Sequence, residues 1–409
     1  MLFTSLLKYA FRTQAIRVVD AKGKQQTFGD GSKPRCTLYL KKISLNYTLV
    51  FNPSISVAEA FMDGDIVIED GTLFDFIEVV AINYRHVEDF PLLRLFRWIG
   101  IGSKKLKQYN PIGIAQKNVA HHYDLSTELY TLFLDDDRQY SCAYFTEPDE
   151  DLETAQRNKK RHLASKLLLS TRNLKVLDIG SGWGGLALYI SDVSEADVTG
   201  VTLSKEQWKL SNARAQTLGA DDRVRFRLGD YRELSDKFDR VVSVGMFEHV
   251  GKKNYQEYFA KINDLLTEDG VAVIHSIGRL DSPSAINPFI RKYIFPGADV
   301  PSLSEVMPVI ERSGLVCSDI EILRIHYAET LRHWREAFNA RRHEIAAIYD
   351  EHFCRMWDLY LVICEMGFRY ENLIVFQIQL SKSLETLPLT RDYMIDWERR
   401  QSDKERNHG

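Results

Sequence analysis

Residues 174–190 read Leu-Lys-Val-Leu-Asp-Ile-Gly-Ser-Gly-Trp-Gly-Gly-Leu-Ala-Leu-Tyr-Ile. A short apolar strand over 176–179 leads into a turn that holds four glycines, and an apolar helix begins near Trp183. Glycines permit tight or left-handed turns and let a ligand approach bare backbone. The free N–H groups at the start of the helix favour a polar ligand. The stretch therefore predicts the first βα turn of a nucleotide-binding α/β sheet.

The ligand of this turn is not fixed by the glycines alone, because a tight strand–helix turn can also exist without one. Gly180, Gly182 and Gly185 satisfy the Gly-x-Gly-x-x-Gly pattern of dinucleotide sites. That pattern also requires an acidic residue about 20 residues further on. The next strand instead ends in Thr202 and Leu203, with no acid. The turn with its legible strand and helix favours a ligand, but one other than NAD.

Composition narrows the class of protein. With 409 residues the chain can form two or three domains, and 44% hydrophobic with 27% charged residues is typical of a globular protein. A net charge of −4 does not suit a chain that coats nucleic acid, so we expect no nucleic-acid partner. The five cysteines form no Cys-x-x-Cys pair, which argues against a zinc site or a disulfide framework and favours the cytoplasm. No segment has the apolar length of a membrane span, so we expect any membrane contact to be peripheral.

The pattern along the chain predicts four parts. Residues 1–90 form a small α/β domain, in which the apolar run 48–51 is strand-like. Residues 91–117 form a linker of basic and aromatic residues, either a contact with an anionic membrane surface or a solvated interdomain helix. Residues 118–385 form the main domain, and 386–409 form a charged tail that we expect to be frayed beyond Trp397.

The main domain alternates strands and helices from 174 to about 278, as a parallel, doubly wound sheet requires. Two later strand-like segments, 316–325 and 370–380, are expected to pair antiparallel, with helices between them. Ligands bind at the carboxyl ends of strands, where the strand order reverses. If the first and fourth strands flank that point, four groups converge there: the glycine turn, Asp230-Tyr231, Met246-Phe-Glu-His249 and His275.

Two groups of polar residues receive an ordinary structural interpretation. His121, His122 and Asp124 could suggest a metal, but adjacent histidines lie on different faces of a helix, so capping or packing is favoured. The helix over 150–172 is basic and amphipathic. We expect its basic residues to form its solvated face: Arg157, Lys159, Lys160 and Arg161.

Several motifs together resemble one family, the cyclopropane-fatty-acyl-phospholipid synthases and the related mycolic acid cyclopropane synthases. The resemblance covers nearly all of 118–380. The pieces that carry it are His122-Tyr-Asp-Leu-Ser126, Tyr140-Ser-Cys-Ala-Tyr-Phe145, Leu177-Asp-Ile-Gly-Ser-Gly-Trp-Gly184, Gly200-Val-Thr-Leu-Ser-Lys-Glu-Gln207, Phe247-Glu-His-Val-Gly251, His275-Ser-Ile277 and His326-Tyr-Ala-Glu-Thr-Leu331. The last five together are far more specific than the glycine turn alone. Residues 57–71 also look like the phospholipid-binding domain of the bacterial enzymes, which favours a phospholipid-bound acyl chain as acceptor.

The resemblance implies a Rossmann-like class I methyltransferase that uses S-adenosylmethionine. Ordinary members of that class hold the ribose with an acid after the second strand, whereas this family uses the Thr202-Leu203 backbone and Gln207. The family transfers a methylene group to a cis double bond. By the same matching, the cofactor site is implied to consist of Tyr140, Ser141, Asp178, Gly180, Gly182, Thr202, Leu203, Gln207, Asp230 and Tyr231.

The chemistry requires a base in a dry pocket. An alkene must attack the sulfonium methyl with its π electrons, which leaves a carbocation that water would trap. A base then removes a proton from the new methyl so that the ring closes. In the family this base is a bound bicarbonate. The resemblance implies that it is held by Cys142, Glu248, His275, the Ile277 backbone and Tyr327.

Some questions stay open at this stage. Cys364 matches a cysteine once proposed as the family's nucleophile, so it is kept as a catalytic candidate. However, the chemistry needs no thiolate, and its apolar helix favours a core or acyl-channel position. A lipid methyltransferase that makes methyl-branched or methylene chains, a small-molecule methyltransferase and a catalytically inactive lipid-binding protein are the alternatives. We expect an enzyme at the inner face of the membrane and leave a homodimer open.

Overall fold

The computed structural model describes residues 2–51, 53–83, 126–171 and 173–408. The chain forms two compact units, each assembled from three pieces of sequence. The first unit comprises 1–108, 286–296 and 331–372, and the second comprises 109–285, 297–330 and 373–409. The predicted linker over 91–117 and the residues His121, His122 and Asp124 lie outside the described residues.

The first unit begins with a small α/β fold, as predicted. Its four strands are β1 (Ala15–Val19), β2 (Gln25–Phe28), β3 (Pro34–Leu40) and β4 (Ile66–Glu69), in the order β2-β1-β3-β4. Its first helices are α1 (Leu2–Ala10), α2 (Leu45–Phe51), α3 (Pro53–Met62) and α4 (Leu73–Ile82). The strand predicted over 48–51 is therefore wrong, because this run continues a helix that begins at Leu45. A short apolar run has no periodicity that separates a strand from a buried helix.

Later parts of the chain complete the first unit. They are the π-helical turn η5 (Ile290–Ile294), most of α14 (His326–Ala340), α15 (Arg342–Ile348) and α16 (Glu351–Tyr370). The α16 helix packs on α3 and α4. Arg355 donates from Nε to the Met62 carbonyl at 2.6 Å, and the Tyr370 hydroxyl donates to Glu78 at 2.9 Å. Segments separated by almost 300 positions thus share one fold.

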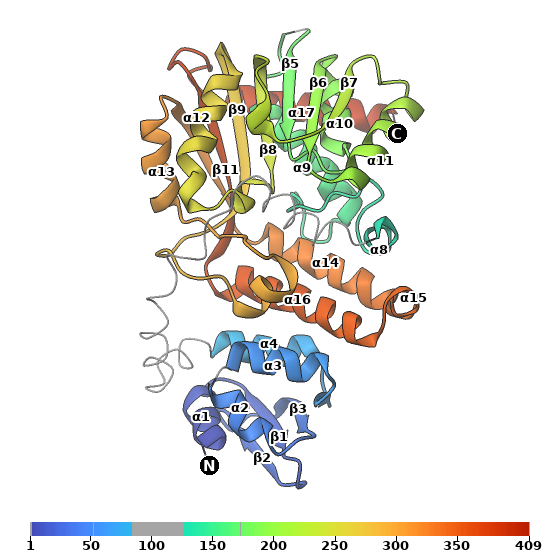
Figure 1. The fold of residues 1–409 in the computed structure, drawn as a ribbon, viewed down its shortest axis with the longest axis vertical. Helices are drawn as coiled ribbons and strands as arrows, with labels where there is room; N and C mark the ends of the chain where they lie inside the picture. The colour runs from blue at the N-terminus through green and yellow to red at the C-terminus, as the bar shows by residue number, and fades with distance from the viewer. Residues whose placement is uncertain (1, 52, 84–125, 172, 409) are drawn as a thin grey trace. The chain divides into compact units, whose positions relative to one another are not determined.

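The second unit is a seven-stranded mixed sheet with the order β10-β11-β9-β8-β5-β6-β7 (Figure 1). The five strands β5 to β9 are parallel, and β11 joins β9 and β10 with antiparallel pairing. The strand bounds are β5 (Lys175–Ile179), β6 (Asp197–Thr202), β7 (Val224–Leu228), β8 (Phe238–Val244), β9 (Leu266–Arg279), β10 (Val316–Leu323) and β11 (Leu373–Ser381). The predicted sheet and the antiparallel pair are confirmed.

Helices cover both faces of this sheet. On one face α12 (Tyr255–Leu265) and α13 (Leu303–Arg312) pack against Leu177 and Ile274, and on the other α9 (Leu152–Lys166), α10 (Gly185–Ser194) and α11 (Lys205–Thr217) pack against Val176 and Val273 (Figure 1). Neighbouring residues of one strand enter different cores because side chains alternate between the faces. The remaining short elements of the unit are α8 (Thr127–Thr131) and the 3₁₀ turns η2 (Tyr231–Glu233), η3 (Phe247–His249) and η4 (Lys252–Asn254).

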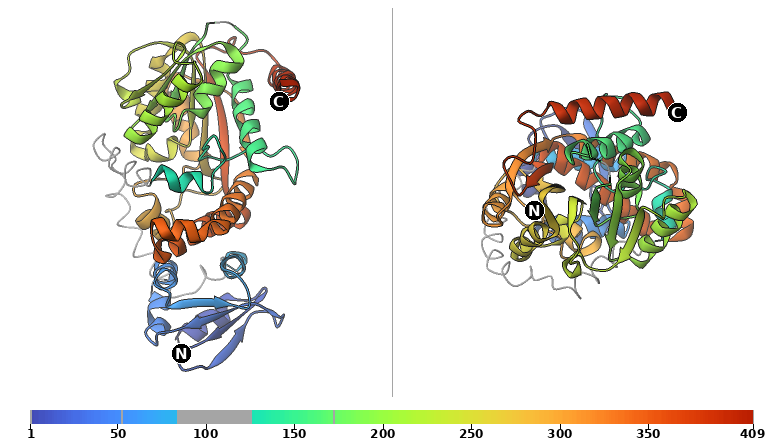
Figure 2. Two further views of the ribbon diagram at one scale, coloured as in Figure 1. Left: turned by 90° about the vertical axis from the view of Figure 1, so that its right-hand side faces the viewer. Right: turned by 90° about the horizontal axis from the view of Figure 1, so that it is seen from above.

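The C-terminal segment differs from its prediction. Residues 392–408 form one helix, α17 (Asp392–His408), which runs alongside α9 (Figure 2). Glu405 accepts from the Arg161 guanidinium and from the Tyr189 hydroxyl, both at 2.6 Å. These contacts with buried or half-buried groups hold the helix in place, so the expectation of a frayed end is wrong. Two of its acidic residues, Glu398 and Glu405, contact His162 and Arg161 of α9, whereas most of its other charged residues are exposed.

The basic face of α9 is also not as predicted. Only Arg157 is exposed, whereas Lys160 is half-buried and Lys159 and Arg161 are buried, with exposed fractions of 0% and 7%. The physical reason is that α9 is covered on two sides, by the sheet and by α17. Among the described residues no helix combines the length and the apolar character that crossing a membrane requires.

Candidate active site

The predicted glycine turn lies between β5 and α10 and has the expected backbone. Gly180, Gly182 and Gly184 all have positive φ angles, of 80°, 54° and 87°. Gly184 caps α10 from the left-handed region, and a Cβ atom there would approach the Phe226 ring to 2.6 Å. A larger residue would therefore both strain the backbone and collide with the core. The turn leaves its backbone bare where the sheet changes direction, because β5 has β6 on one side and β8 on the other.

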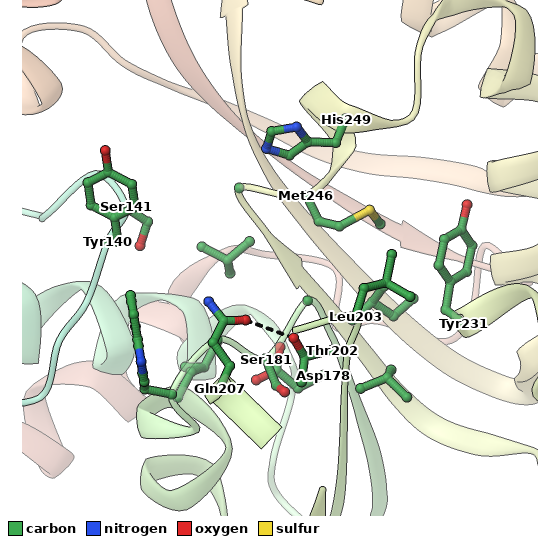
Figure 3. Close-up of a pocket in the computed structure, with 18 of the residues that line it drawn as sticks. Tyr140, Ser141, Asp178, Ser181, Thr202, Leu203, Gln207, Tyr231, Met246 and His249 are labelled. Atoms are coloured by element: carbon green, nitrogen blue, oxygen red, sulfur yellow. Dashed lines mark hydrogen bonds between the residues drawn. The ribbon is translucent and has the colours of Figure 1, made fainter. Parts of the chain in front are cut away.

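A cavity opens at this switch point, at the carboxyl ends of the parallel strands (Figure 3). It lies entirely within the second unit. All ten residues that the sequence implied for the cofactor line it: Tyr140, Ser141, Asp178, Gly180, Gly182, Thr202, Leu203, Gln207, Asp230 and Tyr231. Four separate loops supply them, so the topology brings together residues that lie far apart in the sequence.

The end of β6 presents a polar pair. Thr202 donates from its hydroxyl to Gln207 Oε1 at 2.7 Å, as the dashed line in Figure 3 marks. The Ser204 side chain caps α11 by accepting from the Gln207 N–H at 3.3 Å. Because its carbonyl oxygen is engaged, the Gln207 amide can offer its N–H groups to a ligand. This pair occupies the position where an acid holds the ribose in ordinary members of the class.

The end of β7 presents Asp230 and Tyr231. Asp230 is buried and caps η2, and its carboxylate forms a double hydrogen bond with the Arg232 guanidinium at 2.9 and 2.7 Å. Burial raises the pKa of the Tyr231 hydroxyl, which therefore stays neutral. Tyr231 and Leu203 both line the cavity, and Figure 3 draws them on the same side of it.

Asp178 is unusual among the cavity residues. It is the penultimate residue of the strand β5 and has an exposed fraction of 2%, and its Oδ2 atom has no hydrogen-bond partner among the described residues. Burial raises the pKa of this carboxyl to about 7. A buried, unpaired carboxylate costs free energy, so a cationic or N–H-bearing ligand that reaches Oδ2 would offset that cost. This observation fits the cofactor, whose amino-acid part carries an ammonium group.

The residues implied for the base form two pairs beside the cavity, not in its lining. Glu248 in η3 is buried, and its Oε1 accepts from the Ile277 N–H at 2.6 Å, while Oε2 has no partner among the described residues. Burial raises the pKa of the Glu248 carboxyl to about 7. The Ile277 backbone, expected to hold the bicarbonate, thus donates its N–H to Glu248. A free carboxyl oxygen fits a small hydrogen-bonding base such as bicarbonate.

His275 precedes Ile277 by two positions on β9, so both side chains face the same side of the sheet. Its Nδ1 lies 3.1 Å from the Gln377 amide nitrogen of β11. Burial lowers the pKa of His275 well below its ordinary value. The ring is therefore neutral at pH 7 and can act as a hydrogen-bonding group but not as a stored proton.

The second pair consists of the segments that carry Cys142 and Tyr327. The Ala143 N–H donates to the Thr330 hydroxyl at 3.0 Å, and the Phe145 N–H donates to His326 Nδ1 at 3.1 Å. The loop with Cys142 is thereby fixed to the first turn of α14, which bears Tyr327. Burial raises the pKa of the Cys142 thiol, so this group is neutral and acts as a donor or a packing group.

Cys364 is not brought to the cavity. It lies on α16 in the first unit, whereas the cavity is lined by the second. Burial raises the pKa of its thiol to about 12, which leaves almost no thiolate at pH 7. This supports the reservation already drawn from the chemistry.

The structure adds Gln139 and Trp183 to the cavity, two residues that the sequence did not indicate. Gln139, Trp183, Met246 and His249 line the cavity, and Figure 3 shows His249 beside Met246 at its rim. Burial lowers the pKa of His249 to about 4, so it is neutral. Met246 and His249 belong to the group 246–249 that the sequence placed at the switch point, and both line the cavity. Lys159 was missed altogether, because it was assigned to solvent.

Solved structures agree with this arrangement. The mycolic acid cyclopropane synthase CmaA1 in complex with S-adenosylhomocysteine and CTAB is 31% identical, with a TM-score of 0.61. It covers 66% of this chain and 99% of its own. The sheet order and the glycine-lined cavity define this chain as a class I methyltransferase that depends on S-adenosylmethionine.

Residues 113–378 match the family of the mycolic acid cyclopropane synthetases, and the chain belongs to that family. Residues 2–90 match a domain of unknown function. A probable fatty acid methyltransferase of Pseudomonas putida is 42% identical over 288 residues, which span 68% of this chain and 73% of that protein. The cyclopropane-fatty-acyl-phospholipid synthase of Escherichia coli is 42% identical over 264 residues, with 64% and 67% covered. The family resemblance seen in the sequence is confirmed.

Proposed function

We propose that this enzyme transfers a methylene group from S-adenosylmethionine to the cis double bond of an unsaturated acyl chain in a membrane phospholipid. The product is a cyclopropane fatty acid. The observation that carries the proposal is the buried Glu248, which has one oxygen fixed by Ile277 and the other without a partner among the described residues. Methyl transfer to a reactive nucleophile would need no such group, whereas ring closure needs a base and something to hold it.

The bonds balance as follows. The π electrons of the alkene form a bond to the methyl carbon, the carbon–sulfur bond breaks towards sulfur, and a cation remains on the acyl chain. A proton then leaves the new methyl group, and the electrons of that C–H bond close the ring. When bound, S-adenosylmethionine supplies the electrophilic methyl, and bicarbonate, when bound, supplies the base.

The residues of the chain contribute position, dryness and hydrogen bonds. Glu248 would hold the base through Oε2, and a carboxyl that stays partly protonated near pH 7 can accept or donate as the base changes its protonation state. Neutral His275 would add a second hydrogen bond to the base without competing for the proton. The buried Phe247 packs behind Glu248 against Tyr255 and Tyr258 and fixes its backbone.

A second candidate is a lipid methyltransferase that makes methyl-branched chains, and the Pseudomonas relative named a probable fatty acid methyltransferase favours it. Both enzymes would form the same cation and differ in which proton is lost. We also propose that the acceptor is reached from the inner face of the membrane through a peripheral contact. The N-terminal fold of the first unit is the proposed contact, because it lies outside the methyltransferase family match.

The test uses purified enzyme with vesicles of a cis-monounsaturated phosphatidylglycerol and phosphatidylethanolamine mixture. One sample receives unlabelled S-adenosylmethionine and the other the methyl-deuterated form. We expect a high-field ring-methylene signal in the proton spectrum of the first sample. In the second, mass spectrometry should show an acyl product that has lost one of the three deuterons. If the product retains all three deuterons, the enzyme makes a methyl-branched chain and not a cyclopropane.

A further inference from the structure

Lys159 occupies a position that ordinary packing does not explain. It lies on α9 with an exposed fraction of 0%. Its ammonium donates to Gln139 Oε1 at 2.5 Å and to Ser141 Oγ at 2.9 Å. Both partners line the cavity, and both are uncharged. Burying the ammonium costs desolvation free energy. The neutral oxygens and the nearby charges of Asp135 and Asp137 offset this cost only in part, since the pKa of Lys159 stays below its ordinary value.

The hydrogen bonds around Lys159 assign a direction to the Ser141 hydroxyl. Because Lys159 donates to its oxygen, the hydroxyl proton must point to another acceptor. The Gln139 side chain is held on both sides, because its Oε1 accepts from Lys159 and its Nε2 donates to Asp137 at 3.0 Å. The Ser141 backbone is fixed as well, because Gln156 donates to its carbonyl at 3.0 Å. Ser141 therefore presents an O–H donor to the cavity, polarised by a cation behind it.

A buried charge of opposite sign lines the same cavity. Asp178 has an exposed fraction of 2% and a carboxyl oxygen with no partner among the described residues. Figure 3 shows Ser141 and Asp178 on the walls of one space, with Gln207 between them. The cofactor's amino-acid part is a zwitterion, with a carboxylate and an ammonium on one carbon. Its carboxylate is the only anionic group of the molecule.

We propose that Lys159 is a positioning residue for the cofactor: acting through the Ser141 hydroxyl, it holds the carboxylate of the amino-acid part, while Asp178 takes the ammonium. The inference rests on the proposed cofactor site and is independent of the lipid acceptor. The site selects a cofactor with both charges over one that lacks the carboxylate.

The electrostatic surroundings agree with this role. Burial lowers the pKa of Lys159 to about 8, so the ammonium is still largely protonated at pH 7. A carboxylate held beside Ser141 would stabilise it further. The charged and titratable groups that act on Lys159 or respond to it are Asp135, Asp137, Lys160, Cys142, Asp178 and His275.

The experiment measures binding without lipid or bicarbonate, by calorimetry with S-adenosylhomocysteine and with its decarboxylated analogue. We expect the native enzyme to bind S-adenosylhomocysteine roughly 10- to 100-fold more tightly than the analogue, as a charge-assisted hydrogen bond implies. Lys159→Met should remove most of this preference. The variant should bind S-adenosylhomocysteine more weakly by roughly the same factor. Its affinity for the analogue should change by less than about threefold.

Two further variants keep the result interpretable. Lys166→Met is the matched control, because Lys166 is also buried on α9 but bonds to Glu321, which does not line the cavity. Its affinity for S-adenosylhomocysteine should be unchanged. Ser141→Ala should reproduce the ligand-selective loss, and the double variant with Lys159→Met should lose little more, because the two act in series. Should Lys159→Met fail to fold, Ser141→Ala carries the test alone.

The contrary outcomes are distinct. If Lys159→Met weakens the binding of both ligands equally, the residue has only a structural role and the proposal is overturned. A native enzyme that binds both ligands equally would overturn it as well. A native enzyme that binds neither ligand would instead refute the cofactor site itself, whatever the lipid product. Tight, carboxylate-dependent binding without any acyl product would uphold the inference while the proposed acceptor fails.

Discussion

Helix α9 carries two buried lysines, seven positions apart, and their surroundings differ in kind. Lys166 pairs with the carboxylate of Glu321, which also accepts from His162 Nε2 at 2.7 Å. The other ring nitrogen of His162 lies 3.1 Å from Glu398 of α17. Lys159 bonds only to neutral oxygens among the described residues. One helix therefore separates a region of paired charge from a region of unpaired charge.

The carboxyl groups of the two regions have pKa values shifted in opposite directions. In the region around Lys166, burial opposes ionisation of Glu321. The hydrogen bond from His162 and the charge of Lys166 still lower the pKa of Glu321 to about 2. At the cavity, burial dominates and raises the pKa of Asp178 and of Glu248 to about 7. Each of these two carboxyls keeps one oxygen without a partner among the described residues. Paired charges stabilise the fold, whereas unpaired ones are held ready for ligands.

The largest effect should come from Glu248→Gln. The Ile277 N–H can still donate to the amide oxygen, so the fold is retained, but the hydrogen bonding of this residue to the proposed base is changed. We expect methylene transfer to fall by roughly a thousandfold, within the range for general acid–base groups, while S-adenosylhomocysteine binding changes little. Radiolabel transfer to phospholipid vesicles and calorimetry measure the two quantities. Glu398→Gln, on α17, should keep normal turnover, and a loss of cofactor binding in Glu248→Gln would contradict the assigned role.

Asp178→Asn should have an intermediate effect: it should raise the stability of the ligand-free protein and lower its affinity for the cofactor. Because the folded pKa is raised, the carboxyl lowers the stability of the ligand-free protein as the pH rises from about 4 to 7, and the full cost remains above that range. The variant should therefore unfold with a free energy roughly 1–3 kcal/mol higher at pH 8, a gain that disappears near pH 4. Cofactor affinity should fall roughly tenfold or more.

Thermal unfolding at several pH values and calorimetry with S-adenosylhomocysteine separate the two effects. A variant that is less stable at every pH would mean that Asp178 has a structural partner.

The smallest effect should come from Glu321→Gln, which removes the paired charge at the other end of the helix. Because the folded pKa is depressed, Glu321 contributes stability above about pH 4.5, and this contribution is lost as the pH falls towards 2. Since the side chain is one-third exposed, we expect a loss of only roughly 1–2 kcal/mol at pH 7. Urea titration measures it. Turnover per folded molecule should stay at the native level, and a drop would mean that the two regions are coupled.

The sequence predicted the elements whose signal is local. The glycine turn, the alternation of strands and helices and the position of the ligand site follow from backbone geometry and from the short-range pattern of apolar residues. The switch point between β5 and β8 is as expected, and residues at or just after the ends of β5, β6 and β7 meet there. These features depend on few contacts beyond the neighbouring element, which is why one sequence suffices to infer them.

The features that the sequence did not predict depend on contacts with segments far away in the chain. Lys159 was assigned to solvent because lysines on a surface helix usually are, and only α17 and the cavity loop reveal that α9 is covered on both sides. A signal was nevertheless present, since Lys159 lies four positions from both Ala155 and Leu163, which are buried. Similarly, the partner of Ile277 could not be inferred, because the contact joins η3 to β9 across 29 positions.

The order of strands in the larger sheet has a consequence for synthesis on the ribosome. β11 lies between β9 and β10, yet it is the last of the three to emerge, after the helices that complete the other unit. Until residue 381 has left the exit tunnel, β9 and β10 each expose an edge that the finished protein covers. The edges of β9 and β10 therefore stay unpaired in the nascent chain until β11 has been synthesised. A ribosome stalled shortly before this point would carry an aggregation-prone intermediate.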